Sequence, residues 1–264
     1  MRNNDIPIYS KTDFENMRQA GALAAHVLDT LYERIHPGIS TLEINDLCHE
    51  IIIKNNATPA PLNYKGFPKS VCTSVNHVVC HGIPSDRKIL EEGDMVNVDV
   101  TVILNGWYGD TSRMFVAGKT NKKNYNFLKL TYDALMAGIE EAKPGNHIGD
   151  IGNKIQNLAE GNGYSVVRDF CGHGIGKEFH TPPSVLHFGE PGEGPKLEPG
   201  MFLTIEPMIN LGGWQTKILN DGWTAVTKDK SLSAQFEHTI GITEYGNEIF
   251  TLSKNDTAFP IKDI

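Results

Sequence analysis

Two segments of the sequence follow one pattern, and this internal repeat limits the folds that the chain can adopt. Leu90–Val100 reads LEEGDMVNVDV and Leu197–Pro207 reads LEPGMFLTIEP, 107 residues later. Each segment contains L-E-x-G, and an acidic residue follows that glycine by six positions, Asp99 in the first and Glu206 in the second. A shared pattern of this length indicates a duplicated structural unit.

Other landmarks repeat in the same order. Pro37 in HPGISTLEI and Pro144 in KPGNHIGDI are also 107 residues apart, and each follows a segment of helical periodicity. Between these landmarks, CHGIPSD and GHGIGKE align His81 with His173 at an offset of 92 residues, so the connecting loops differ in length. The two halves therefore share one order of elements.

The secondary-structure signals repeat as well, with a pair of helices and a run of strands in each half. Apolar residues at helical spacing predict helices over 12–34, 42–54, 124–142 and 148–161, the first capped by Thr12. Alternation and β-branched residues predict strands over 70–82, 95–103, 201–209, 224–228 and 235–243. We expect an α+β fold with pseudo-two-fold symmetry, an antiparallel sheet backed by helices. It should form a single catalytic domain, 1–264, with repeat halves at roughly 12–118 and 124–250.

Composition excludes several classes of protein. An apolar content of 39% over 264 residues is enough for a large core. The net charge of −8 argues against binding nucleic acid by bulk electrostatics. We expect no signal peptide, because acidic residues interrupt the N-terminal segment, and no membrane helix, because no apolar run reaches about 20 residues. The four cysteines form no C-x-x-C pair, which favours a reduced, cytoplasmic protein.

One hairpin brings two carboxylates together. Asn105-Gly106 is the typical sequence of a two-residue type I′ turn, and counting outward from it pairs Thr101 with Asp110. Because strand side chains alternate, Asp99 shares the face of Thr101 and becomes a diagonal neighbour of Asp110, roughly 6 to 8 Å away. Two carboxylates on one surface among valines need a cation nearby or become protonated.

The second half supplies further candidate ligands. Glu206 is the repeat counterpart of Asp99, Glu237 lies in the predicted strand QFEHTIGIT, and His173 lies in a predicted turn between two glycines that permit unusual backbone angles. Together with Asp99 and Asp110, these three residues form an oxygen-rich set of ligands with one imidazole. Such a set suits two divalent ions, Mn, Fe, Co or Zn, rather than a structural zinc held by cysteines.

These residues also have simpler interpretations. Single acids in strands most often face solvent, and a histidine in a glycine-rich loop is more often structural than a ligand. GHGIG lacks the spacing of a phosphate-binding P-loop, and HVVCH, His77–His81, lacks the helix and Glu of a zinc protease motif. Cys80 beside His81 lacks the context of a catalytic thiol.

Four longer motifs carry a family resemblance. NVDVTVILNGWYGDTSRMF, CGHGIGKEFHTPP, FLTIEPM and SAQFEHTIGIT resemble the methionine aminopeptidases of the bacterial, type I kind, and the likeness covers about residues 10 to 253. The resemblance implies the pita-bread fold and removal of the initiator methionine from nascent chains and peptides. Only about 30 residues separate Glu206 from Glu237, which leaves no space for the helical insertion of type II enzymes.

The resemblance also implies a role for each candidate ligand. Asp99 would bind one of two divalent ions, Asp110 and Glu237 would bridge both, and His173 with Glu206 would complete the other. The ions would activate a bridging hydroxide.

Further roles concern the substrate. His81 and His180 would hydrogen-bond the scissile amide, and Glu206 would act as the base for the attacking water. The methionine pocket would be formed by Tyr64, Phe67, Cys72, Phe179 and Trp223. The segment YKGFP departs from the YHGYP of some relatives, so the resemblance does not predict the outer part of the pocket.

The resemblance extends to partners. Asn76, Val78 and Ser233 match residues that hold a monovalent cation in some relatives. The substrates would be nascent polypeptide N-termini near the ribosome, and we expect a cytoplasmic monomer.

Two other functions are consistent with parts of the sequence. An X-Pro aminopeptidase or prolidase would share the fold and ligand types, although those enzymes usually carry an extra N-terminal domain. A relative without metals could serve as a binding module on ribosomes or nucleic acid, but such relatives typically lose ligand residues, and all five are present here.

Overall fold

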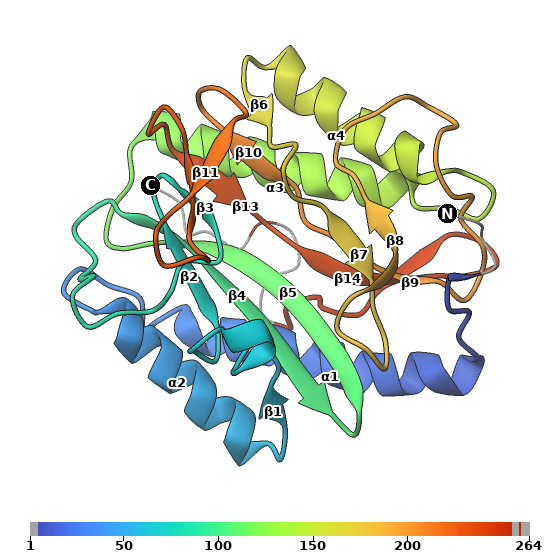
Figure 1. Cartoon of the computed structure of the whole chain (residues 1–264), viewed down its shortest axis with the longest axis horizontal. Helices are drawn as coiled ribbons and strands as arrows, with labels where there is room; N and C mark the ends of the chain where they lie inside the picture. Colours follow the sequence, from blue (N-terminus) through green and yellow to red (C-terminus); the bar gives the residue numbers. More distant parts are fainter. Residues whose placement is uncertain (1–4, 255–258, 260–264) are drawn as a thin grey trace.

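A computed structural model describes residues 5–254 and 259. Strands occupy the centre of the molecule, with two helices on each side (Figure 1). The helices are α1 (Lys11–Leu31), α2 (Thr41–Lys54), α3 (Lys122–Glu141) and α4 (Ile148–Gly161). All four predicted helices are thus confirmed, and α4 has the predicted bounds. No described helix has the length and apolar character needed to cross a membrane.

The start of α1 differs from the prediction. Ser10, not Thr12, is the N-cap, since its extended backbone lets the hydroxyl accept from the Asp13 N–H while the Asp13 carboxylate accepts from the Ser10 N–H. This reciprocal pair is a capping box, which satisfies two amide groups at the helix start. Ser40 and Glu43 form the same arrangement at α2.

The strands of the described residues form four antiparallel sheets, and a short 3₁₀ turn covers Tyr64–Gly66. The strands are β1 (Thr58–Pro59), β2 (Cys72–Val75), β3 (Val78–Cys80), β4 (Met95–Leu104), β5 (Trp107–Val116), β6 (Ser165–Val166), β7 (Gly172–Gly174), β8 (Thr181–Val185), β9 (Phe202–Ile205), β10 (Met208–Asn210), β11 (Thr216–Ile218), β12 (Ala225–Thr227), β13 (Ser233–Gln235), β14 (His238–Ile242) and β15 (Asn247–Ile249). In one sheet β4 pairs with β1, β2 and β5, and the others follow the orders β15-β14-β9-β7-β8, β13-β10-β6 and β11-β12-β3.

The β4–β5 hairpin has the predicted register. Asn105 and Gly106 have φ values of 52° and 80°, as a type I′ turn requires. Thr101 therefore pairs with Asp110. On the opposite face, valines of β4 such as Val98 and Val100 are fully buried against α1 and α2. This core fixes which face of the hairpin carries the carboxylates.

The second half is built differently from the prediction. The segments 201–209 and 235–243 are not continuous strands, because β9 gives way to β10 at Glu206-Pro207 and β13 to β14 at Phe236-Glu237. Pro207 has no N–H to donate to a ladder. The Glu237 N–H donates to the Ser112 carbonyl of β5 at 3.1 Å. Both glutamates thus lie where one sheet passes into another.

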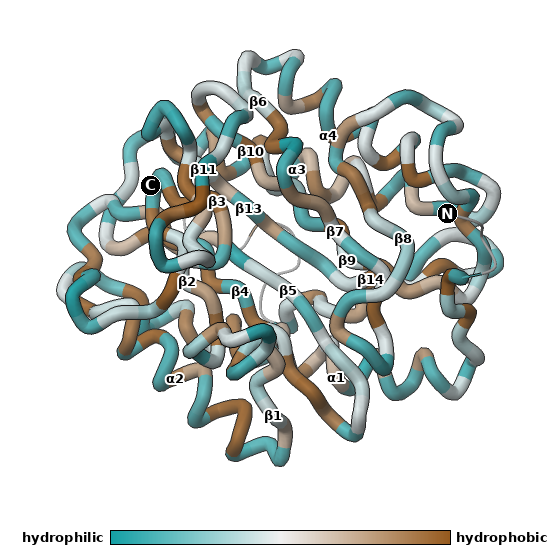
Figure 2. Tube along the Cα trace, viewed as in Figure 1, coloured by the Kyte–Doolittle hydropathy of each residue, from teal (hydrophilic) through white to brown (hydrophobic). Residues whose placement is uncertain are grey.

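A second core lies under α3 and α4. Phe127, Leu135 and Ile151 are fully buried in it, together with Leu203 of β9 and Ile240 of β14. Hydrophilic residues are frequent along the outer loops (Figure 2). Each half therefore places a helix pair behind antiparallel strands, which confirms the α+β class. The repeat bounds 12–118 and 124–250 and the single domain stay predictions.

Candidate metal centre

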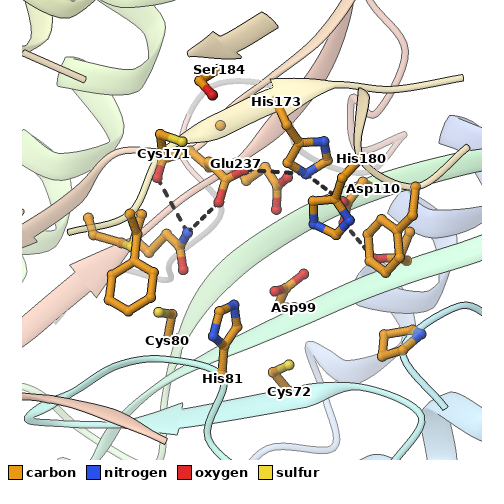
Figure 3. A pocket seen from close by; sticks show the side chains of 18 of the residues that line it. Cys72, Cys80, His81, Asp99, Asp110, Cys171, His173, His180, Ser184 and Glu237 are labelled. Carbon is orange, nitrogen blue, oxygen red and sulfur yellow. Dashed lines mark hydrogen bonds and ion pairs between the residues drawn. The ribbon is translucent and has the colours of Figure 1, made fainter. Parts of the chain in front are cut away.

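The predicted site residues converge on one cavity of about 490 Å³. Those that line it are Phe67, Cys72, His81, Asp99, Asp110, His173, Phe179, His180, Glu206, Trp223 and Glu237. Tyr64 does not line the cavity, but its ring packs on Phe179 and its hydroxyl meets His180. Figure 3 shows how the labelled side chains gather around this space, among them Asp99, Asp110, His173 and Glu237.

Three carboxylates meet at the floor of the cavity. Asp99 of β4, Asp110 of β5 and Glu237 each offer an oxygen, and these oxygens lie within 4.8 Å of one another. Thr101, two residues after Asp99 and opposite Asp110, donates its hydroxyl to Asp110 Oδ1 at 2.7 Å. The hairpin register thus creates both the carboxylate pair and one of its hydrogen bonds.

His173 presents a lone pair to this group. Its Nδ1 lies 3.0 Å from the Gly174 carbonyl, which can only accept, so the proton is on Nδ1. Burial lowers the pKa of His173 to about 4, so the ring is neutral. Its unprotonated Nε2 lies 3.6 Å from Asp110 Oδ2 and 3.7 Å from Glu206 Oε1. A carbonyl on the far nitrogen is the usual arrangement of a metal-binding histidine.

The two glycines beside His173 are needed for a reason other than the predicted one. Gly172 and Gly174 belong to strand β7 rather than a turn, and neither has a positive φ. A Cβ at Gly172 would lie 2.3 Å from the Thr204 carbonyl oxygen, and one at Gly174 would lie 2.2 Å from that of Pro182. Close approach of neighbouring backbone, not an unusual backbone angle, requires glycine here.

Four hydrogen bonds to three side chains fix Glu206. The Thr204 hydroxyl donates to Oε1 at 2.8 Å, and the Gln235 amide donates to Oε2 at 3.2 Å and to the backbone carbonyl at 3.3 Å. The Glu206 N–H, which has left the β9 ladder, donates to Nε2 of the fully buried His187 at 3.0 Å. Glu206 is therefore held by both its side chain and its backbone.

The clustered carboxylates of the cavity favour the binding of cations. Burial raises the pKa of Asp99 to about 7, and burial together with Asp99 raises that of Glu206 to about 8. Burial and neighbouring carboxylates also raise the pKa values of Asp110 and Glu237 well above their ordinary range. Four carboxylates and an imidazole lone pair facing one space repel one another unless positive charge lies between them, so the residues fit divalent metal ions.

Two further histidines lie on the cavity wall. The ring centroid of His180 lies 4.2 Å from that of His173, and its Nδ1 lies 3.0 Å from the Tyr64 hydroxyl. His81 contacts the ring edges of Phe170 and Trp223, and its φ of 56° is unusual for a residue with a Cβ. Neither histidine is part of the carboxylate cluster formed by Asp99, Asp110 and Glu237.

An apolar wall adjoins the histidines. The rings of Phe67 and Trp223 meet edge to face, with centroids 5.2 Å apart. The ring of Tyr64 packs on that of Phe179, with centroids 4.9 Å apart. Cys72 is buried, and desolvation raises its thiol pKa well above the ordinary value, so it behaves as a small apolar group. Aromatic and sulfur side chains suit an unbranched thioether.

The predicted monovalent cation site stays a prediction. The Asn76 carbonyl accepts from the Ser233 N–H at 2.8 Å, and Asn76 has a φ of 55°. Val78 belongs to β3.

Several functional neighbours were not predicted. The hairpin register placed Thr101 on the carboxylate face, but its hydrogen bond to Asp110 was not predicted. Thr204 and Gln235 each lie two residues from a candidate ligand, so strand alternation could have placed them on the same face. His187 and Phe170 carried no such signal. His187 meets Glu206 only because β8 packs near the end of β9, which is a tertiary contact.

Comparison with known proteins agrees with this geometry. The chain matches metallopeptidase family M24 over residues 15–244. It is 57% identical to the methionine aminopeptidase of Rickettsia prowazekii over 97% of this chain and 98% of that protein. It is 54% identical to methionine aminopeptidase A of Synechocystis over 94% and 98%, respectively. The crystal structure of the Rickettsia prowazekii protein matches with a TM-score of 0.92, covering 94% of this chain and 100% of that one at 58% identity.

More distant structures share only the architecture. The prolidase of Pyrococcus furiosus matches with a TM-score of 0.74 at 24% identity, and the match covers 66% of its length. Likeness at that level shows the fold alone, whereas the closer relatives share about half of all residues over nearly the whole length. The chain therefore belongs to the methionine aminopeptidases of metallopeptidase family M24.

Proposed function

We propose that this chain removes the N-terminal methionine from nascent proteins and peptides. The observation that carries the proposal is one cavity in which a carboxylate and imidazole group adjoins an aromatic and thiol wall. The names of the relatives at 54–57% identity support the same activity. Nascent N-termini carry the methionine in the cytoplasm, so we place the enzyme there, acting as a monomer near the ribosome.

Five residues would hold two divalent ions. Asp99 would bind one ion, Asp110 and Glu237 would bind both, and His173 with Glu206 would complete the second. When bound, the ions supply a water that is acidic enough to attack near neutral pH, and they polarise the scissile carbonyl. The donor set accepts Mn, Fe, Co or Zn.

The protein's own groups would manage protons and orientation. Glu206, whose two oxygens accept from Thr204 and Gln235, would take the proton of the attacking water. His81 and His180 would hydrogen-bond the scissile amide and stabilise the negative charge that develops on its oxygen.

The wall residues would select methionine. Phe67, Cys72, Phe179 and Trp223 would surround the side chain and exclude water from it, and Tyr64 would support this wall through its packing on Phe179. Burial of an unbranched thioether against rings and sulfur is favourable, and a charged side chain would lose its hydration there.

Peptide cleavage by the purified, metal-loaded protein tests the proposal. We expect release of methionine from Met-Ala-Ser and little cleavage of an Ala-Pro peptide, measured by chromatography of the products. Preferential cleavage of Ala-Pro would instead identify an X-Pro aminopeptidase. Absence of hydrolysis with Mn, Fe, Co and Zn in turn would contradict both activities.

A further inference from the structure

The Tyr64 hydroxyl lies beside one ring nitrogen of His180. It lies 3.0 Å from His180 Nδ1, and the two rings are nearly parallel, with centroids 5.4 Å apart and an interplanar angle of 23°. The His180 ring lines the cavity beside His173, with ring centroids 4.2 Å apart (Figure 3). The hydroxyl therefore occupies Nδ1 of an imidazole that lines the cavity, and Nε2 is the nitrogen left for a substrate.

A neutral imidazole has a single N–H, so the partner of one nitrogen decides what the other can do. Among the described residues, Nδ1 is the one acceptor within reach of the Tyr64 O–H. If the phenol donates to Nδ1, the ring proton lies on Nε2, toward the cavity. In the reverse arrangement the ring Nδ1–H would donate to the phenol oxygen and the phenol proton would turn to solvent, a weaker pairing because the phenol is the stronger acid and the imidazole nitrogen the stronger base.

We propose that Tyr64 is a positioning residue that holds His180 in its Nε2–H tautomer, so that this imidazole meets the substrate as a hydrogen-bond donor. The proposal rests on the proposed role of His180 as a donor to the scissile amide. It also separates the two wall histidines, since the His81 ring has no hydrogen-bond partner among the described residues and can adopt either tautomer.

Tyr64 thus has two separable parts. Its ring forms part of the apolar wall through Phe179, and its hydroxyl acts on His180. Tyr64→Phe removes the hydroxyl and keeps the ring. Tyr108 offers a matched control, because its ring stacks on the same Phe179 at 5.6 Å but forms no hydrogen bond with either wall histidine.

Steady-state kinetics on Met-Ala-Ser form the first measurement. In Tyr64→Phe we expect kcat to fall about three- to tenfold, the effect of one lost hydrogen bond on the population of the competent tautomer, with KM and bound metal unchanged. Tyr108→Phe should match the wild type. A rise in KM with unchanged kcat would mean that the hydroxyl serves only the pocket, and it would overturn the proposal.

Nitrogen-15 NMR of the histidine rings in zinc-loaded protein forms the second measurement, and it needs no substrate. We expect His180 in the wild type to show a protonated Nε2 and an unprotonated Nδ1, and in Tyr64→Phe to show a mixture, with the signals assigned by their loss in His180→Ala. A protonated Nδ1 in the wild type, or an unchanged tautomer in Tyr64→Phe, would refute the role. If the tautomer result holds but Met-Ala-Ser is not cleaved, the proposed function fails and the role of Tyr64 stands.

Discussion

The Asp110 carboxylate lies near three other candidate ligands, since it neighbours Asp99 and Glu237 and its Oδ2 lies 3.6 Å from His173 Nε2. Replacing it by Asn keeps the shape and the partner Thr101 but removes the negative charge. We expect Asp110→Asn to lose at least about 10³ in turnover and to bind less metal, while staying folded. Turnover of Met-Ala-Ser and elemental analysis of the purified variant measure this.

A carboxylate at the rim of the same cavity provides the control. Asp169 lines the cavity but accepts from Thr216 on β11, away from the other acids. Asp169→Asn should keep its metal and most of its turnover. If Asp110→Asn behaves like Asp169→Asn, the metal assignment fails.

His81 stores backbone strain at the cavity wall. Its φ of 56° is a left-handed conformation that costs a residue with a Cβ roughly 1 to 2 kcal/mol, whereas glycine adopts it freely. We therefore expect His81→Gly to be more stable than His81→Ala by about 1 kcal/mol, although both lose activity. Urea unfolding of the metal-free variants measures the difference.

The reverse order is expected at a helical histidine. His49 lies inside α2, where glycine is less favourable than alanine by about 1 kcal/mol. His49→Gly should thus be less stable than His49→Ala. Equal stability of the two His81 variants would show that no strain is stored there.

At the level of helices and strands, the sequence predicts those features that local backbone geometry determines. A two-residue turn fixes the register of β4 and β5, so the pairing of Thr101 with Asp110 followed from Asn105-Gly106. The breaks before β10 and β14 did not follow, because the Glu206 N–H turns to His187 and the Glu237 N–H to Ser112. Those partners are distant in sequence, and no periodicity signals them.

The contact between β7 and β9 yields the next prediction. A Cβ at Gly172 would press on the Thr204 carbonyl, and Thr204 holds both the His173 N–H and Glu206 Oε1. Gly172→Ala should therefore cost about 1 to 3 kcal/mol of unfolding free energy and weaken metal binding together. Calorimetric metal titration and urea unfolding test both effects.

A glycine outside the site serves as the comparison. Gly161 ends α4 and has open space where a Cβ would lie. Gly161→Ala should leave metal binding unchanged and add about 0.5 to 1 kcal/mol of stability. Unaltered metal affinity in Gly172→Ala would show that the strand spacing does not govern the site.

At the scale of the molecule, the candidate metal centre is built from both predicted repeat halves. Asp99 and Asp110 come from β4 and β5, whereas the other three candidate ligands come from after α4. Hydrogen bonds join the two parts directly behind the carboxylates, since the Thr111 hydroxyl donates to the Glu237 carbonyl at 2.7 Å and the Thr239 hydroxyl to the Asp110 carbonyl at 2.6 Å. Folding therefore brings like charges together, and metal binding and stability are coupled.

This coupling predicts how the stability of the metal-free protein depends on pH. Folding raises the pKa of Asp99 from 3.8 to about 7 and that of Glu206 from 4.5 to about 8. As pH rises toward these values, the unfolded chain has released protons that the folded protein still binds, so stability falls. Buried histidines such as His187, with pKa values lowered from 6.5, give the opposite slope only below about pH 6.5. Buried thiols such as Cys72 and Cys80, whose pKa values are also raised, add to the fall only as pH approaches the ordinary thiol value of 9.0. Most of the slope between pH 6.5 and 8.5 therefore belongs to the carboxylates.

We expect the melting temperature in EDTA to decrease across this window, and added Mn²⁺ to raise it more at pH 8.5 than at pH 6.5, because the ion removes the repulsion that grows with deprotonation. The variant carrying both Asp99→Asn and Glu206→Gln should show a flatter profile in EDTA and little response to Mn²⁺. Differential scanning calorimetry at matched ionic strength measures all four conditions. A metal-free wild type that becomes more stable toward pH 8.5 would mean that the carboxylates are already compensated by the protein itself, and the argument for cations in this cavity would then fail.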